Sequence, residues 1–208
     1  MGSRERRDRE RAETRERILV AAREMFVRKG YEATTMRAIA ERVEYTPTAI
    51  YHHFRNKEAL LTELAATDFR ALAQAFNRIG QVADPIERLR KIGEAYVEFA
   101  VTHPMQYQLM FMAQRPRPRN GLPHDDPSES AYAFLRQTCA EAIKTGRLRP
   151  EFGDPDELAQ ICWSSTHGLV SLHIVKGHDK GIGWRDVGKT ARRAVDTLIR
   201  GMLGNPEA

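Results

Sequence analysis

The chain has 208 residues and a formal net charge of +5, with 41% hydrophobic and 29% charged residues. This length supports a substantial core, and the basic balance suits a polyanionic partner without requiring one. No apolar run reaches the roughly 18 residues of a membrane-spanning helix, and the Arg-rich N-terminus does not resemble a signal peptide. We therefore expect a cytoplasmic protein with no membrane partner.

Charged side chains crowd the start of the chain, where residues 4–17 hold seven arginines and five acids. One interpretation is a solvated extension of the first helix. The other is a basic arm, residues 1–14. Arms of this kind lie along the phosphates of DNA or enter its minor groove beside a recognition helix that is bound in the major groove. The sequence leaves both interpretations open, and they are compatible.

Two helices are expected next. Apolar residues recur at helical spacing from Ile18 to Phe26, and Lys29-Gly30 gives this helix a basic last turn followed by a C-terminal glycine. Thr34-Thr35 then supplies the N-cap of a second helix. The buried stripe of that second helix consists of Met36, Ile39, Ala40 and Val43.

A tight turn at Glu44-Tyr45 leads into a short third helix, expected from Pro47 to Phe54. Thr46 is its N-cap, and a proline at the first helical position is favourable. Its buried residues are Ile50 and Phe54, and its other faces carry Thr48, Tyr51, His52 and His53. This arrangement is typical of a helix-turn-helix, which presents its second helix to the major groove of DNA.

Residues 15–61 resemble the N-terminal domain of TetR-type transcriptional regulators. The matching residues are Arg17-Ile18-Leu19, Ala21-Ala22, Phe26, Gly30-Tyr31, Thr34-Thr35, Ile39-Ala40, Thr46, Ile50-Tyr51-His52-His53-Phe54 and Lys57-Glu58-Ala59-Leu60. The family usually has glycine where this chain has Glu44. A non-glycine residue in a left-handed turn costs roughly 1 kcal/mol.

The resemblance implies that the partner is a double-stranded DNA operator. We expect phosphate contacts from the arm, Thr35, Lys57 and the hydroxyls of Thr46 and Tyr51. Base reading is expected first from Thr48 and His52, with Arg37 as a further reader. The full candidate set is Thr34, Thr35, Arg37, Thr46, Pro47, Thr48, Tyr51, His52, His53 and Lys57.

The remainder of the chain also reads as helical. Further helices are expected at about residues 56–79, 85–102, from Pro104, from Ser128, at 155–175 and at 184–202, with a Pro-rich loop at 115–127. Strand signals are absent. We therefore predict an all-α fold of about nine helices. A three-helix DNA-binding domain at 15–61 is followed by a larger helical ligand-binding and dimerisation domain at 62–208.

The last two helices carry apolar and small residues along their stripes. These stripes either close the core of one chain or pair with a second copy as a four-helix bundle. The resemblance favours the homodimer. A homodimer would place two reading helices about one DNA turn apart.

Trp163, His167 and Gly168 are similar to a Trp-x-x-x-His-Gly signature of one subgroup of these regulators. Trp163 and His167 share a helix face, and they fit either an ordinary core or the polar end of a ligand pocket. The candidate ligand-binding residues are Tyr96, Phe99, His103, Tyr107, Met110, Phe111, Trp163 and His167. A lining rich in methionine and aromatic residues would suit a hydrophobic or amphipathic effector.

No spacing typical of metal ligands, phosphate loops or a nucleophile and its base occurs, so we expect no metal, cofactor or catalytic residue. Cys139 and Cys162 are expected to be free thiols. The sequence predicts a ligand-responsive, DNA-binding transcriptional regulator, most simply a repressor released by its effector. Three alternatives are an activator of the same fold, a non-specific architectural DNA binder and an enzyme on an all-α scaffold.

Overall fold

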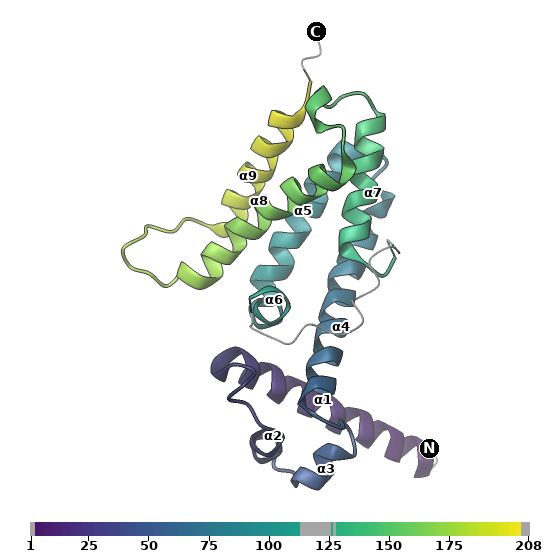
Figure 1. Ribbon diagram of the computed structural model, residues 1–208, viewed down its shortest axis with the longest axis vertical. Helices are drawn as coiled ribbons and strands as arrows, with labels where there is room; N and C mark the ends of the chain where they lie inside the picture. Colours follow the sequence, from purple (N-terminus) through teal and green to yellow (C-terminus); the bar gives the residue numbers. More distant parts are fainter. Residues whose placement is uncertain (1–2, 113–125, 127, 205–208) are drawn as a thin grey trace. The chain divides into compact units, whose positions relative to one another are not determined.

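A computed structural model describes residues 3–112, 126 and 128–204 (Figure 1). The helices of this part are α1 (Ser3–Lys29), α2 (Met36–Arg42), α3 (Pro47–Tyr51), α4 (Lys57–Asn77), α5 (Pro85–Thr102), α6 (Pro104–Phe111), α7 (Ala131–Lys144), α8 (Pro155–Lys176) and α9 (Val187–Met202), with short 3-10 helices η1 (Arg78–Gln81) and η2 (Pro150–Phe152). An isolated bridge joins Leu148 to Leu203, and the described residues form no strand. The predicted all-α fold is confirmed. Most of the loop predicted at 115–127 lies outside the described residues.

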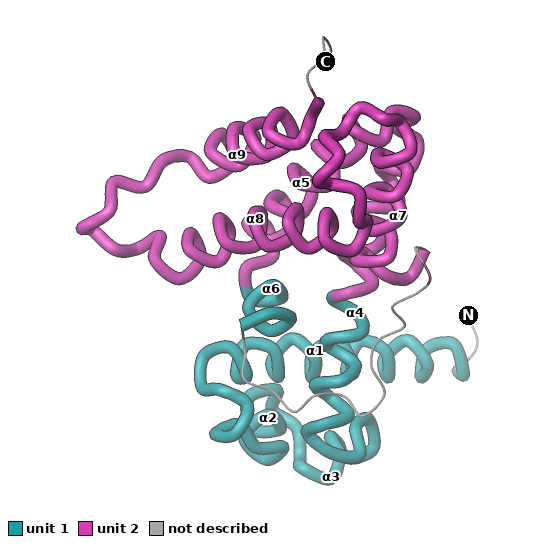
Figure 2. The backbone as a smooth tube through the Cα atoms, turned by 45° about the horizontal axis from the view of Figure 1, so that its top comes forward, with its two compact units in different colours: residues 1–68, 105–121 teal, residues 69–104, 122–208 magenta. Residues whose placement is uncertain are grey.

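The chain divides into two compact units (Figure 2). Unit 1 comprises residues 1–68 and 105–121, and unit 2 comprises residues 69–104 and 122–208. The division therefore falls inside α4, and nearly all of α6 belongs to unit 1. Because a division by spatial contacts does not define functional boundaries, the predicted domain limits at residues 14 and 61 stay predictions.

The core of unit 1 is built from the apolar faces of its short helices. Each helix presents residues at helical spacing to one common cluster, which buries enough side chain to hold α2 and α3 despite their shortness. The largest fully buried members are Ile18, Phe26, Ile39, Ile50, Leu60 and Leu64, and Leu109 of α6 joins them.

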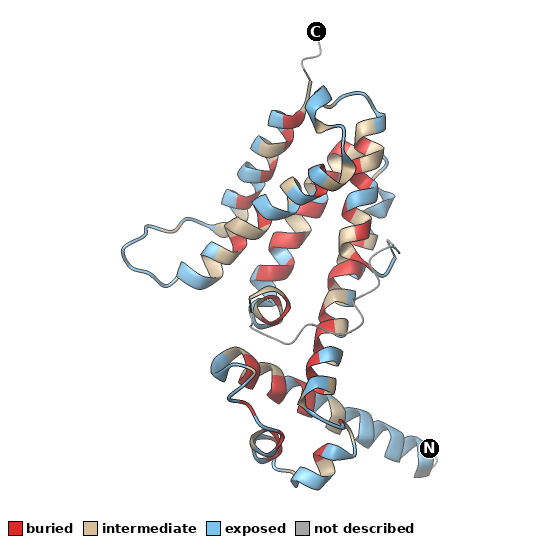
Figure 3. Cartoon of the chain, viewed as in Figure 1, coloured by how far each residue is buried: buried red, intermediate tan, exposed pale blue. Residues whose placement is uncertain are grey.

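Helix α1 begins at Ser3, in agreement with the interpretation of residues 4–17 as an extension of the first helix. Residues 4–13 are exposed along their whole length (Figure 3). Opposite charges four residues apart, such as Arg6 and Glu10 at 3.5 Å, support such a polar helix. In the free chain the basic segment is thus a helical extension of α1. Its contact with DNA stays a prediction.

In unit 2, α5 packs against α7, α8 and α9, and α8 packs against α7 and α9. The buried faces of these helices turn toward one another (Figure 3). Helix α9 approaches α5 closely at Gly93, where an added Cβ would lie 2.8 Å from Val195 Cγ2. Glycine thus allows the two helices to pack closely at this point.

Capping residues set the helix starts. Asp84 and Asp154 cap α5 and α8, each followed by proline, as predicted. Helix α7 begins at Ala131 because Ser130 is its cap, and α9 begins at Val187 because Asp186 is its cap. Both starts are three residues later than expected. Helix α3 ends at Tyr51, earlier than the expected Phe54.

Candidate nucleic-acid interface

The turn between α2 and α3 is a Schellman motif. The amide of Tyr45 donates to the carbonyl of Ala40 at 3.0 Å, and the amide of Glu44 donates to that of Glu41 at 3.2 Å. Glu44 occupies the left-handed position of the motif with φ of 62°, and no other described non-glycine residue has a positive φ. The turn therefore keeps the backbone that glycine would favour, although Glu44 carries a side chain there.

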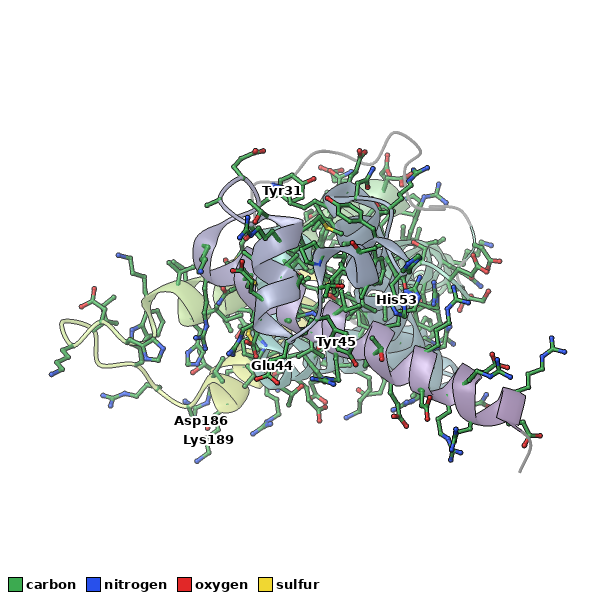
Figure 4. The ribbon with its side chains drawn as sticks, turned by 90° about the horizontal axis from the view of Figure 1, so that it is seen from below. Tyr31, Glu44, Tyr45, His53, Asp186 and Lys189 are labelled. Atoms are coloured by element: carbon green, nitrogen blue, oxygen red, sulfur yellow. The ribbon has the colours of Figure 1, made fainter. Side chains whose placement is uncertain are left out.

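Helix α1 holds this turn in place. Arg17 donates to the carbonyl of Val43 at 3.3 Å, and its guanidinium lies 5.4 Å from the centre of the Tyr45 ring. The hydroxyls of Tyr45 and Thr14 are 3.3 Å apart and share a hydrogen bond. Glu44 and Tyr45 lie at this turn (Figure 4). The Cα–Cβ direction of Glu44 is consequently fixed by contacts on both sides.

Helix α3 presents the predicted reading surface. The Thr46 hydroxyl accepts a hydrogen bond from the amide of Ala49 at 3.2 Å, which caps the helix before Pro47. Ile50 is fully buried and anchors the helix to the core of unit 1. The predicted DNA-binding residues that are exposed on this segment are Thr46, Pro47, Thr48, Tyr51 and His52. The structure thus brings these five together on one short, anchored element.

His53 differs from its neighbours because it is only partly exposed, and its Nδ1 is buried without a hydrogen-bond partner in the described chain. Burial lowers the pKa of His53, and the positive charges of Arg11 and Arg15 and the neighbouring His52 lower it further. A neutral ring suits a position beside two guanidinium groups.

The remaining predicted DNA-binding residues lie around the start of α2 and α4. Thr35 is exposed and caps α2 by accepting from the amide of Ala38 at 3.1 Å. Thr34 is fully buried and donates to the carbonyl of Gly30 at 2.8 Å, so its side chain has a structural role. Arg37 is exposed and pairs with Glu41 at 3.0 Å.

Lys57 is engaged within unit 1. Its ammonium donates to the carbonyl of Tyr31 at 2.6 Å and lies 4.1 Å from the centre of that ring. It thereby ties the start of α4 to the loop before α2. A phosphate contact would require Lys57 to share or exchange these partners.

A buried ion pair inside unit 1 escaped the sequence analysis. Asp68 of α4 is fully buried; its Oδ1 accepts from Arg23 of α1 at 2.6 Å and from Gln106 of α6 at 2.9 Å. The pair links three helices through one carboxylate. A signal existed, because Asp68 follows Leu64 and precedes Leu72 at four-residue spacing on the apolar face of α4.

Part of the predicted ligand set forms a hydrogen-bonded group in unit 2. The Trp163 indole donates to the Tyr96 hydroxyl at 3.1 Å, and that hydroxyl lies 3.0 Å from Nδ1 of His167. If the hydroxyl donates onward to Nδ1, the ring proton of His167 resides on Nε2. Burial lowers the pKa of His167, which favours this neutral form.

The other predicted ligand-binding residues are divided between the units. In unit 2, the rings of Phe99 and His103 stack with centroids 5.1 Å apart. In unit 1, the rings of Tyr107 and Phe111 are 5.0 Å apart, and Met110 is buried. The set of eight therefore does not form one site within either unit.

Cys139 and Cys162 are free thiols, as predicted. Among the described residues, no three His, Cys, Asp or Glu side chains gather where they could hold a metal ion. No helix in the described segments is both long enough and apolar enough to cross a membrane.

A capped reading helix on an anchored helix-turn-helix, joined to a second helical unit, defines a DNA-binding transcriptional regulator. Residues 18–64 match the family described as bacterial regulatory proteins, tetR family, and residues 89–198 match the tetracyclin repressor-like C-terminal domain. The chain belongs to the TetR family. Because this is a family of transcriptional regulators, the alternative of an enzyme is set aside.

Relatives and solved structures agree with this assignment. The HTH-type transcriptional regulator YhgD of Bacillus subtilis is 25% identical over 182 residues, covering 77% of this chain and 94% of the relative. The HTH-type transcriptional repressor KstR2 of Mycolicibacterium smegmatis is 30% identical over 148 residues, covering 67% and 70%. The ketosteroid transcriptional regulator KstR2 of Mycobacterium tuberculosis has the same fold, with a TM-score of 0.71 at 23% identity over 92% of this chain and 96% of that one.

Proposed function

We propose that this regulator is a homodimeric repressor that binds a pseudo-palindromic operator and is released by a small hydrophobic or amphipathic effector. The observation that carries the proposal is the exposed surface of α3. The buried side chain of Ile50 anchors this helix to the core of unit 1, and Thr46 caps its start. The relative from Mycolicibacterium smegmatis is itself named a repressor, which supports the direction of control.

DNA contacts are assigned by chemistry and exposure. Thr48 and His52 carry the hydrogen-bonding groups that would read base edges, and the hydroxyls of Thr35, Thr46 and Tyr51 would contact phosphates. Arg37 would read a base once it leaves Glu41. Lys57 and the arginines of the extended α1 would add salt-dependent affinity.

Dimerisation is proposed through α8 and α9. Leu172 and Val175 of α8 are 57% and 61% exposed, which is unusual for large apolar side chains so close in sequence. Helix α9 carries Ala194 and Gly201 among its exposed positions, where a second helix could approach closely. Two copies related by a two-fold axis would cover this surface and present two α3 helices to successive major grooves.

The effector is proposed to bind in unit 2, with its polar end at the group formed by Tyr96, Trp163 and His167. The ring of Tyr132 lies with its centroid 5.8 Å from that of Trp163, and an aromatic neighbour of this kind suits a hydrophobic body with one polar end. The effector must bind the DNA-bound and released states with different affinity in order to shift their populations.

Gel shifts with the flanking intergenic DNA test the first part of the proposal. We expect a loss of about 1–3 kcal/mol of binding free energy per altered operator base pair. Equal affinity for scrambled half-sites would instead indicate a non-specific binder. Repression is tested by transcription in vitro from the bound promoter, where added protein should lower transcript yield.

The effector claim needs its own measurement. The experiment screens hydrophobic molecules with one polar end, such as long-chain fatty acids and sterol acids, for those that raise the melting temperature of the protein. Each stabilising molecule is then added to the gel shift. If operator affinity stays unchanged under every molecule that stabilises the protein, the proposed coupling is wrong.

A further inference from the structure

The left-handed residue at the helix-turn-helix is the one place in the described chain where a non-glycine side chain adopts a positive φ. Left-handed backbone is sterically unfavourable for a non-glycine residue, and glycine would avoid this cost. Strain of this kind clusters at functional sites, which makes the side chain of Glu44 a candidate functional group.

The carboxylate of Glu44 has no partner among the described residues, unlike three other acids of unit 1. Glu41 pairs with Arg37, Glu24 with Arg42 and Glu63 with Arg15, so these acids are balanced by arginine. Glu44 is exposed, and its side chain forms no hydrogen bond or ion pair with the described residues. It therefore places a negative charge without an ion-pair partner on the surface of unit 1.

The backbone that carries this charge is held in place. Glu44 lies two residues before Thr46, the cap of α3, and the Schellman bonds together with Arg17 and Tyr45 hold the turn. The charge is thus carried at the entry to α3 on a backbone that these contacts hold (Figure 4).

A carboxylate at this place discriminates between DNA groups. It only accepts hydrogen bonds, so it repels phosphates and gains nothing from the acceptor edges of guanine or thymine. In the major groove, the donors it can use are the exocyclic amino groups of cytosine and adenine. DNA without such a group opposite the turn would leave the carboxylate desolvated and unpaired.

We propose that Glu44 is a specificity-determining residue. It weakens binding to DNA in general and favours sites that offer the amino group of cytosine or adenine at the base pair facing the turn. This inference rests on the proposed function, because it takes the α3 surface as the one that reads the operator.

Selection of binding sites from a random duplex library tests the inference, with affinities then measured for the selected site and for a scrambled one. In Glu44→Gln we expect several-fold tighter binding to scrambled DNA and a ratio of specific to non-specific affinity about tenfold lower. The preference for cytosine or adenine should weaken at one position in each half-site.

Two further variants isolate the cause. Glu129→Gln makes the same change of net charge at an exposed position of unit 2 and should leave the affinity ratio unaltered. Glu44→Gly removes charge and strain together, and it should lose selectivity as Glu44→Gln does. Circular dichroism melts confirm that each variant is folded.

The outcomes are separable. If the unaltered protein selects a sequence and Glu44→Gln selects the same one with the same affinity ratio, the inference about Glu44 is overturned while the proposed function stands. If the unaltered protein selects no sequence at all, the proposed function fails and the inference fails with it.

Discussion

At the scale of single residues, Glu44 illustrates what a family pattern reveals and what it leaves out. The departure from glycine was visible in the sequence, and so was the expected backbone of the turn. The pattern did not reveal that the turn would keep φ of 62° instead of changing type. The contacts of Arg17 and Tyr45 that hold it come from α1, far away in sequence.

Replacing Glu44 by glycine should stabilise the protein by about 1 kcal/mol, because glycine adopts the left-handed backbone without steric cost. Urea unfolding followed by circular dichroism measures the change. Glu44→Ala keeps a Cβ and should give little stabilisation. Equal gains from both variants would indicate that the charge, and not the backbone, is what destabilises the turn.

His167 should make stability depend on pH. Its pKa is lowered by burial, so between that value and its usual value near 6.5 the unfolded chain binds more protons than the folded one. The contribution is fully present above about pH 6.5 and is lost as the pH falls through the folded pKa.

His167→Asn keeps an acceptor near the Tyr96 hydroxyl but does not titrate, so the melting temperature of this variant should fall less steeply below about pH 6.5. His53 also has a lowered pKa and contributes in the same direction. His53→Asn therefore serves as a comparison from unit 1. An unchanged slope in His167→Asn would contradict the assignment.

At the scale of helices, capping chemistry is the part that the sequence specifies best. An aspartate followed by proline at Asp84 and Asp154 marked helix starts that the structure keeps. The extension of α1 before Ile18 stayed one of two open interpretations because residues 4–13 carry no apolar stripe, and their helix is supported by charge pairs instead. Periodicity of apolar residues cannot detect a helix that buries nothing.

Contacts between helices that are far apart in the chain could not be predicted from the sequence, for a physical reason. Tyr96 and Trp163 are 67 residues apart, and nothing in the local pattern of either helix specifies the other as its partner. Asp68 was detectable as a charge on an apolar face, but its pairing with Arg23 depends on how α1 crosses α4. Tertiary packing decides both.

Gly93→Ala should destabilise unit 2 by about 1–3 kcal/mol, because the new Cβ would lie 2.8 Å from Val195 Cγ2 and valine has little rotamer freedom. This clash outweighs the gain of about 1 kcal/mol that alanine brings to a helix interior. The free energy of unfolding in urea reports the difference.

The matching double variant tests the cause. Val195→Ala removes the clashing methyl groups, so Gly93→Ala combined with Val195→Ala should lose less stability than the two single losses added together. Simple additivity of the two losses would mean that the α5 and α9 contact does not limit the residue at position 93.

At the scale of the whole molecule, the proposed dimer makes a prediction about mass and affinity together. Leu172→Glu would place a charge in each half of the proposed interface, so the variant should elute as a single chain. Operator affinity should fall on the order of 10²-fold, because the two helix-turn-helix units are no longer linked and cannot bind the two half-sites together.

Light scattering after size exclusion gives the mass, and a gel shift gives the affinity. Val101→Glu is the control, because Val101 is an exposed apolar residue of α5 with 39% exposure. It should leave both quantities unchanged. A Leu172→Glu variant that remains a dimer would rule out α8 as the contact.

The grouping of α6 with unit 1 has a consequence for how the protein opens. Leu109 joins the core of that unit, and Gln106 donates to the buried carboxylate of Asp68, although about forty residues separate the two segments. Cooperative opening follows spatial clusters and not chain order. Amide hydrogen exchange in residues 105–111 should therefore slow and quicken together with that of α1 and α2. In Asp68→Asn, exchange should accelerate in these segments, while α5, although adjacent to α6 in sequence, should exchange as before.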